Sequence, residues 1–245
     1  MKAVITAGGR VDAAYAGVAG TDIKALAMTN GVTMLDRIIG ALRVSGVTHI
    51  AVVGGADVLR ACAGRIERGV DESESGAQNV LRALHAWPDD DDEPLLYATS
   101  DLPYVTGAAV SDFVLRTPRD AVAMAVTEHA DFTARFPGAP PFGIELARER
   151  IVNGGIFSLP EGSRAKLAAI AIRFFEARKA PWRMAGLVNP LAMLRLATGR
   201  LSIAHVEREA KRVLKIPALA VRGCAPELAF DADTLAEYRY ACENR

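Results

Sequence analysis

The sequence predicts an α/β fold, a Rossmann-like three-layer sandwich built on a mostly parallel sheet. Two observations support this prediction. Apolar runs that suit buried strands alternate with helical segments over the first 130 residues, and this alternation is typical of parallel strands joined by right-handed crossovers. The run Leu95–Ala98 is apolar on both faces, as expected of a strand that helices cover on both sides.

The composition limits the classes of function. The chain has 245 residues, 29 Lys and Arg and 29 Asp and Glu, enough for one large domain and without a net charge that would attract nucleic acid or an anionic membrane. Its three cysteines are far apart and its four histidines lack metal-ligand spacing, which predicts a reduced, cytoplasmic protein without a zinc site. No apolar run approaches the roughly 20 residues of a membrane span. We therefore expect small-molecule partners rather than nucleic acid or membrane.

The first predicted strand, Lys2–Thr6, runs into the pair Gly8 and Gly9. A strand, a glycine turn and a helix form the layout in which backbone N–H groups can surround a phosphate. The three-glycine fingerprint of dinucleotide-binding proteins is absent, which argues against a nicotinamide-dependent oxidoreductase. Small residues dominate Asp12–Gly20 and predict a mobile loop over a site. Lys24 follows; from the pattern alone it is a solvated loop lysine.

The next elements continue the alternation. The clearest helix is Thr33–Ser45, which Thr33 can cap and which carries one apolar face. The other elements predicted up to residue 130 are the strands His49–Val53, Leu95–Ala98 and Ala121–Thr127, and the helices Ala56–Ile66, Ala77–Trp87 and one that Thr106 caps. The acidic stretches Asp71–Gly76 and Pro88–Pro94 are interpreted as a solvated turn and linker, because consecutive carboxylates on an extended chain point in different directions.

Asp101 is the most informative single residue. It follows the apolar strand closely, and Pro103 prevents that strand from continuing because proline lacks the N–H that a ladder needs. The Asp101 carboxylate is therefore expected at the carboxyl edge of the sheet, where open α/β sheets bind ligands. The pattern leaves two interpretations open: a turn cap before Pro103, or a ligand of a hard cation such as Mg²⁺.

The second half of the chain has fewer strands. Phe132–Phe142 is interpreted as a proline-rich loop or a short excursion of the chain. Arg150–Leu159 is interpreted as a strand whose residues Asn153, Gly154 and Gly155 mark a bulge or a close approach of backbone to a ligand. Helices then follow in succession between residues 161 and 214, with breaks at Pro181 and Pro190. The end of the chain is predicted as the strands Pro217–Arg222 and Glu227–Asp231 and a closing helix, Leu235–Cys242.

Four features thus meet at strand ends of one sheet: the glycine pair, Asp101, the Asn-Gly-Gly segment, and Asp231 with Asp233. Phosphoryl or nucleotidyl transfer requires backbone N–H groups that bind phosphates, a nearby lysine and two separated carboxylates. Mg²⁺ prefers one or two carboxylates together with substrate phosphates. The chemistry is otherwise positioning and charge neutralisation, and needs no protein nucleophile.

Five segments, in this order, resemble one known family: AVITAGG, Lys24-Ala25-Leu26, LLYATSDLPYVT, NGGIFSL and DADTLAEY. Together they resemble the MobA-like NTP transferase family of the nucleotide-diphospho-sugar transferase superfamily. The resemblance implies that superfamily's fold with a C-terminal helical insertion, over one domain of residues 1–245. Residues 1–130 would form the nucleotide-binding half, and residues 131–245 the acceptor-binding half, with the helical insertion at about 161–214.

The resemblance also implies roles for particular residues. The residues implied to bind the nucleotide are Ala7, Gly8, Gly9 and Arg10, with Lys24 on the phosphates and Gly76, Gln78 and Asn79 near the base or ribose. Lys24 and Asp101 would be catalytic. Asp101 and Asp233 would bind Mg²⁺, with Asp231 as the less favoured metal ligand. Asn153, Gly154 and Gly155 would lie against the acceptor.

The implied reaction is transfer of a nucleoside monophosphate from an NTP, with GTP or CTP favoured, to a phosphorylated acceptor, releasing pyrophosphate. Molybdopterin, a sugar or polyol phosphate and a cobamide precursor remain candidate acceptors. One departure stands out: relatives place an arginine in a Gly-x-x-Arg pattern, whereas Arg10 directly follows Gly9.

That departure keeps a catalytically weak, nucleotide-binding regulatory protein open as an alternative. A sugar-nucleotide-dependent glycosyltransferase is the other alternative, although Ser100-Asp101-Leu102 stands where such enzymes place Asp-x-Asp. The helical segment is expected to shape the acceptor pocket or a homodimer surface.

Overall fold

One large sheet organises the computed structural model, which describes residues 1–88, 91–178 and 189–244. Its strand order is β10-β7-β9-β6-β1-β4-β5, and β8 pairs with β9. The parallel strands are β1 (Lys2–Thr6), β4 (His49–Gly54), β5 (Arg68–Asp71), β6 (Leu95–Thr99), β7 (Val122–Glu128) and β10 (Ala218–Val221). Strand β9 (Arg150–Leu159) runs antiparallel between β6 and β7, and β8 is Ile144–Glu145. The predicted mostly parallel sheet is confirmed.

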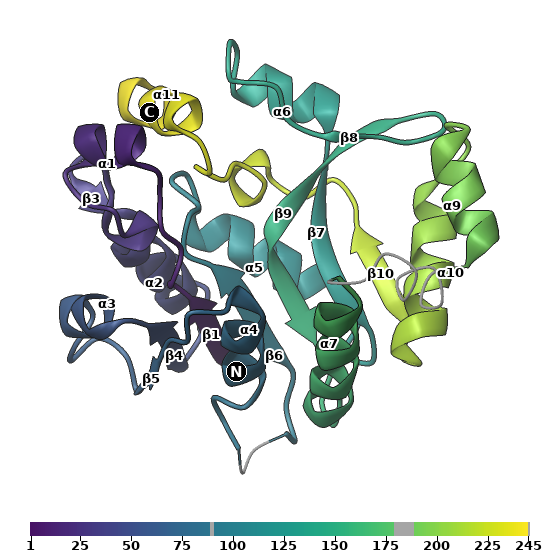
Figure 1. The fold of residues 1–245 in the computed structure, drawn as a ribbon, viewed down its shortest axis with the longest axis horizontal. Helices are drawn as coiled ribbons and strands as arrows, with labels where there is room; N and C mark the ends of the chain where they lie inside the picture. The colour runs from purple at the N-terminus through teal and green to yellow at the C-terminus, as the bar shows by residue number, and fades with distance from the viewer. Residues whose placement is uncertain (89–90, 179–188, 245) are drawn as a thin grey trace.

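Helices cover both faces of this sheet and make the three layers (Figure 1). One face carries α2 (Met34–Val44), α3 (Ala56–Ala61) and α5 (Gly107–Arg116), and the other carries α4 (Gly76–Leu84), α7 (Arg164–Arg178) and α10 (Ile203–Leu214). Neighbouring side chains of strand β1 point to opposite faces of the sheet. Ile5 packs against the helices of the first face, and Val4 packs against those of the second face. The central strands are buried on both faces, which explains their nearly continuous apolar sequences.

The helix predicted over Thr33–Ser45 shows how local sequence sets an element. The Thr33 side chain accepts a hydrogen bond from Asp36 N–H at 3.0 Å and caps α2. Leu35, Ile38 and Leu42 then recur at helical spacing and are fully buried against the sheet.

The remaining elements surround the carboxyl edge or the sides of the sheet. They are α1 (Ala13–Ala19), η1 (Lys24–Leu26), β2 (Met28–Thr29), β3 (Val32–Thr33), α6 (His129–Arg135), α9 (Pro190–Ala197), η2 (Pro226–Leu228) and α11 (Leu235–Glu243). Figure 1 shows α1 at the start of the chain and α11 at its end lying side by side, and the Tyr15 and Tyr238 rings stack there at 4.7 Å.

Two segments that were predicted as loops, near the start and the middle of the chain, contain helices. Asp12–Gly20 was expected to be a mobile loop, but it contains α1, since Asp12 caps the Tyr15 N–H at 2.8 Å and Gly20 ends the helix with a φ of 74°. Phe132–Phe142 was expected to be a loop or a short excursion, but its first four residues belong to α6, because Phe132 and Phe136 anchor this helix in an aromatic cluster. Residues 136–142 contain no helix or strand.

Two strand assignments also change. Strand β5 was missed because its sequence, RGVD, is short and polar. Glu227–Asp231 was expected to be a strand, but its first two residues belong to η2 and none of residues 227–231 lies in a strand. Leu228 N–H and Ala229 N–H bond within this turn, to Ala225 and Pro226 carbonyls, rather than to a neighbouring strand. The predicted break at Pro181 and part of the acidic run Pro88–Pro94 lie outside the described residues.

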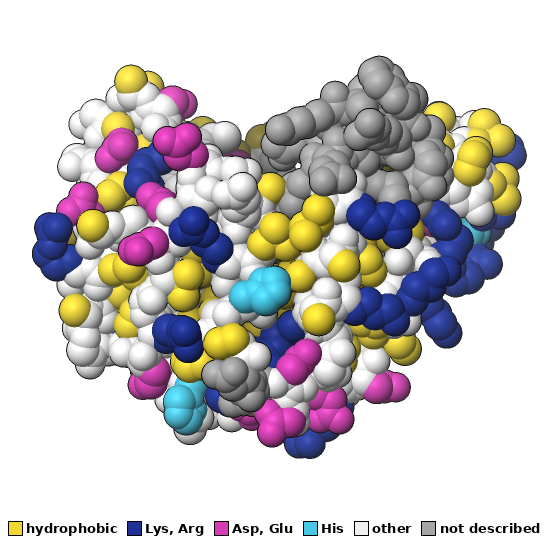
Figure 2. Space-filling view, turned by 60° about the horizontal axis from the view of Figure 1, so that its bottom comes forward, with side chains coloured by type: hydrophobic (Ala, Val, Ile, Leu, Met, Phe, Trp, Pro, Cys, Tyr) yellow, Lys and Arg dark blue, Asp and Glu magenta, His cyan; other side chains and the backbone are white. Residues whose placement is uncertain are grey.

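Charged side chains of both signs share the face shown in Figure 2, with basic side chains gathered toward its right side. Within the described residues, no helix is long and apolar enough to cross a membrane.

Candidate active site

A cavity of about 540 Å³ opens at the carboxyl edge of the sheet. Five segments contribute to its wall: the end of β1 with its following turn, the start of η1, the turn after β5, the start of α4 and the end of β6 with its following residues. Its lining residues are Thr6, Gly8, Gly9, Arg10, Lys24, Glu72, Ser73, Glu74, Gly76, Asn79, Val80, Tyr97, Thr99, Ser100 and Asp101. Residues from Thr6 to Asp101 in the sequence are thus brought together, because parallel strands end at the same edge.

The glycine pair forms the floor of this cavity beside the end of β1. A side chain at Gly8 would collide with the Glu72 carboxylate, and one at Gly9 would contact Lys24. Ala7 does not line the cavity. Its N–H donates to the Val53 carbonyl at 2.8 Å, so this N–H continues the sheet and cannot face a nucleotide.

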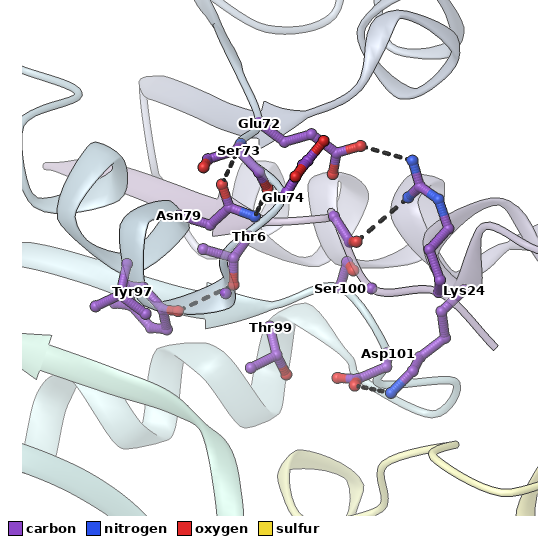
Figure 3. Close-up of a pocket in the computed structure, with 15 residues that line it drawn as sticks. Thr6, Lys24, Glu72, Ser73, Glu74, Asn79, Tyr97, Thr99, Ser100 and Asp101 are labelled. Atoms are coloured by element: carbon purple, nitrogen blue, oxygen red, sulfur yellow. Dashed lines mark hydrogen bonds and ion pairs between the residues drawn. The ribbon is translucent and has the colours of Figure 1, made fainter. Parts of the chain in front are cut away.

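Lys24 connects two carboxylates that are far apart in the sequence. Its ammonium group donates to Asp101 Oδ2 at 2.8 Å and also to Asp233. Burial by itself would lower the pKa of Lys24, but the two carboxylates outweigh burial and raise its pKa above the ordinary value. Lys24 is therefore a fixed positive charge at the end of β6, and not a solvated loop lysine. Figure 3 shows Lys24 and Asp101 meeting at one end of the cavity.

Asp231 lies near Asp101 and Asp233 and is less exposed than Asp233. Burial, followed by repulsion from Asp233 and Asp101, raises its pKa from 3.8 to about 7. The Asp233 side chain is 58% exposed, and Asp233, rather than Asp231, contacts Lys24. The geometry therefore favours Asp233 over Asp231 as the partner of Asp101.

Arg10 lines the same cavity and lies beside Lys24, because its backbone pairs with that of Ile23. Its guanidinium donates to Glu72 Oε1 at 2.6 Å and to the Gly8 carbonyl at 3.2 Å. Figure 3 shows Glu72 and Asp101 at opposite ends of the cavity. Arg10 thus reaches the glycine turn despite its shifted position in the sequence, but Glu72 already neutralises its charge.

The three residues expected near the base or ribose lie in different settings. Gly76 and Asn79 line the cavity, whereas Gln78 does not. The Asn79 side chain accepts from Ser73 N–H at 2.6 Å and donates to the Ser73 carbonyl at 3.1 Å. Gln78 accepts from the Ser73 hydroxyl at 2.6 Å. Both amide side chains therefore shape the turn after β5.

The three residues expected against the acceptor lie outside the cavity wall. Gly154 packs against Ala125 and Gly155 against Thr99, so closely that a side chain on either glycine would collide with its neighbour. The register between β7 and β9 shifts at this point, which confirms the predicted bulge. The close approach is to other strands of the protein, and Asn153 is exposed.

The carboxylates suit a hard divalent cation. Lys24 contacts both Asp101 and Asp233, so their oxygens face a common point, and Asp101 Oδ1 is buried without a hydrogen bond among the described residues. Within that part of the chain, no group of three or more His, Cys, Asp or Glu side chains could hold a metal. Two carboxylates would leave the other positions to phosphates and water, as is usual for Mg²⁺.

Sequence reasoning missed Glu72 and Tyr97 as cavity residues. Glu72 directly follows the unpredicted β5, so its place at a strand end was not apparent. Tyr97 points into the cavity from β6, where its hydroxyl lies 3.0 Å from Thr6 Oγ1; its position in an apolar strand suggested only core packing.

A glycine turn, a lysine and two converging carboxylates at one edge of a parallel sheet define an enzyme of phosphate-group transfer. Residues 3–236 match the model of the MobA-like NTP transferase domain. The chain therefore belongs to this family, whose members transfer nucleotidyl groups, and the predicted class of enzyme is confirmed. Among proteins with curated descriptions, no sequence matches this chain.

Solved structures agree with the fold. A hypothetical transferase from Thermus thermophilus is 27% identical, with a TM-score of 0.82 over 97% of this chain and 98% of that chain. A CMP:2-keto-3-deoxy-manno-octonic acid synthetase in complex with CTP is 14% identical, with a TM-score of 0.59 over 99% and 98%. A Mycobacterium tuberculosis protein in complex with manganese is 17% identical, with a TM-score of 0.52 over 100% and 98%. The predicted nucleotide-diphospho-sugar transferase fold is confirmed.

Proposed function

We propose that this protein is a Mg²⁺-dependent nucleotidyltransferase that moves a nucleoside monophosphate from an NTP to a phosphorylated small molecule. The observation that carries the proposal is the convergence of Asp101 and Asp233 on Lys24, next to the turn of Gly8 and Gly9. GTP or CTP is the favoured donor, and the structural likeness to a synthetase complexed with CTP supports the second.

In the proposed reaction, an oxygen of the acceptor phosphate attacks the α-phosphorus of the NTP. The bond from this phosphorus to the oxygen that bridges the α- and β-phosphates breaks, and pyrophosphate leaves. Gly8 and Gly9 allow the phosphates to approach the backbone, and Lys24 donates to their oxygens. Asp101 and Asp233 would hold Mg²⁺, which offsets phosphate charge when bound.

The proposal divides the domain between its two substrates. The cavity residues all lie within the first 130 residues, and these would hold the nucleotide. Residues 131–245 would face the acceptor, with exposed Asn153 as the expected contact and Gly154 and Gly155 as packing residues that let β9 pass close to β6.

Pyrophosphate release tests the proposed function. ATP, GTP, CTP and UTP would each be combined with Mg²⁺ and with sugar phosphates, polyol phosphates, molybdopterin and a cobamide precursor. We expect turnover with one NTP–acceptor pair, in which GTP or CTP is the donor. Nucleotide binding without turnover for any pair would favour a regulatory protein instead, and cleavage of a sugar nucleotide would favour a glycosyltransferase.

The Arg10–Glu72 ion pair leads to a separate prediction. Glu72 places a negative charge beside the glycine turn, so Glu72→Gln is expected to strengthen the binding of all four NTPs by about fivefold, corresponding to about 1 kcal/mol. Isothermal titration with each NTP measures this change. Glu74→Gln is the matched control, since Glu74 lines the same cavity without contacting Arg10. Weaker binding of one base alone would contradict this electrostatic explanation.

A further inference from the structure

Ala232, between the two carboxylates Asp231 and Asp233, is held by hydrogen bonds at both ends of its backbone. Its N–H donates to the Asp101 carbonyl at 3.0 Å. Its own carbonyl accepts from the Tyr15 hydroxyl at 3.2 Å. Ala232 is completely buried, so no solvent can replace either bond.

Tyr15 is well suited to hold this carbonyl. It belongs to α1, is 1% exposed, and stacks on Tyr238 of α11 with ring centroids 4.7 Å apart. Burial raises the pKa of Tyr15 far above its ordinary value, so the hydroxyl keeps its proton and remains a donor. The segment predicted to be a mobile loop thus contributes a rigid contact to the acidic end of the chain.

The two hydrogen bonds to the Ala232 backbone fix the position of the backbone that leads into Asp233. On its other side, Thr234 is fixed by a capping box: Thr234 N–H donates to Glu237 Oε2 at 2.6 Å, and Glu237 N–H donates to Thr234 Oγ1 at 3.3 Å. Asp233 therefore stands between two fixed backbone positions, and its side chain extends to Lys24. The Ala232 N–H bond to Asp101 sets the same segment relative to the first carboxylate.

We propose that Tyr15 is a positioning residue: through the Ala232 carbonyl it holds Asp233 where that carboxylate can share one divalent cation with Asp101. This inference rests on the proposed function, which assigns these two carboxylates to the metal. Without the hydroxyl, a buried carbonyl would lose its partner, which is costly enough to shift a short loop. Residues that orient metal ligands typically change metal affinity by 10- to 100-fold when they are substituted.

Mn²⁺ binding without nucleotide provides the test, because Mn²⁺ takes carboxylate ligands and is observed directly by electron paramagnetic resonance. Tyr15→Phe removes only the hydroxyl and keeps the ring that stacks on Tyr238. Tyr238→Phe is the matched control, because the Tyr238 hydroxyl bonds the Met28 carbonyl at 2.9 Å, away from the acidic segment. We expect Tyr15→Phe to weaken Mn²⁺ binding about tenfold and Tyr238→Phe to change it less than about twofold.

Thermal unfolding of both variants distinguishes a specific effect on the position of Asp233 from a general loss of stability of the fold. If both variants lose equal stability and only Tyr15→Phe binds Mn²⁺ more weakly, the inference is supported. Equal weakening in both variants, or none in Tyr15→Phe, would overturn it. Asp101→Asn tests the underlying assignment independently: if this variant binds Mn²⁺ like the unaltered protein, or if the unaltered protein binds none, the metal site itself is wrong and both proposals fail.

Discussion

Asp101→Asn is expected to lower the turnover number for pyrophosphate release by about a thousandfold, which corresponds to about 4 kcal/mol of lost transition-state stabilisation. The substitution keeps the size of the side chain but removes the charge that faces Lys24 and Asp233. Asn also binds a hard divalent cation less strongly than a carboxylate does. The measurement is the turnover number at saturating NTP and acceptor over a range of Mg²⁺ concentrations.

Two controls make this result interpretable. Asp57→Asn carries the same chemical change at an exposed position of α3, where Asp57 contacts Arg60, and it should leave turnover unchanged. Circular dichroism of the Asp101 variant should match that of the unaltered protein, because the Asp101 backbone carbonyl still accepts from Ala232 N–H. Undiminished turnover in Asp101→Asn would remove the basis for the proposed chemistry.

Asp231→Asn is expected to stabilise the metal-free protein near pH 7.5 by up to about 4 kcal/mol, because a pKa that differs by one between the folded and unfolded states corresponds to about 1.4 kcal/mol. Burial and the neighbouring carboxylates raise the pKa of Asp231 from 3.8 to about 7. The folded protein therefore binds this proton more tightly than the unfolded chain does. The stability that the bound proton contributes is full below about pH 4 and is lost as the pH rises toward 7.

Urea unfolding with a chelator present, at pH 4, 5.5 and 7.5, measures this effect as the difference between variant and unaltered protein. The difference should be small at pH 4, where Asp231 is largely protonated in the folded protein and partly protonated in the unfolded chain, and should grow as the pH rises. Asp57→Asn, at an exposed position, should show no such trend. An Asp231→Asn variant with no gain at pH 7.5 would show that Asp231 carries no unfavourable charge in the folded protein.

Much of the candidate site could be predicted because its residues immediately follow strands or precede a helix. Asp101 closely follows β6 and precedes Pro103, and Gly8 and Gly9 follow β1. Thr234 begins α11 through a local capping box, and the resemblance of the segment Asp231 to Thr234 to the family singled out Asp233. Each of these signals depends on neighbours within a few residues, so it can be read from sequence.

The errors have the opposite cause. Strand β5 is held by pairing with β4, which compensates for a sequence with weak strand propensity. Gly154 and Gly155 were expected to meet a ligand, yet the neighbours that require them to be glycine are Ala125 and Thr99 on adjacent strands. Nothing within a few residues of either glycine distinguishes a ligand from a strand.

By itself, the sequence therefore determined the class of fold and the strand-end position of Asp101, because apolar periodicity, caps and glycine turns act locally. The family came from the resemblance of five motifs, which the domain match confirms. Only the tertiary structure decided how charges pair: Lys24 with Asp101 and Asp233, and Arg10 with Glu72. It also brought the Tyr15 hydroxyl to Ala232, 217 residues further along the chain. Such contacts depend on how strands and helices pack in three dimensions, and side-chain charge and hydrogen bonding have no periodicity that would reveal them in advance.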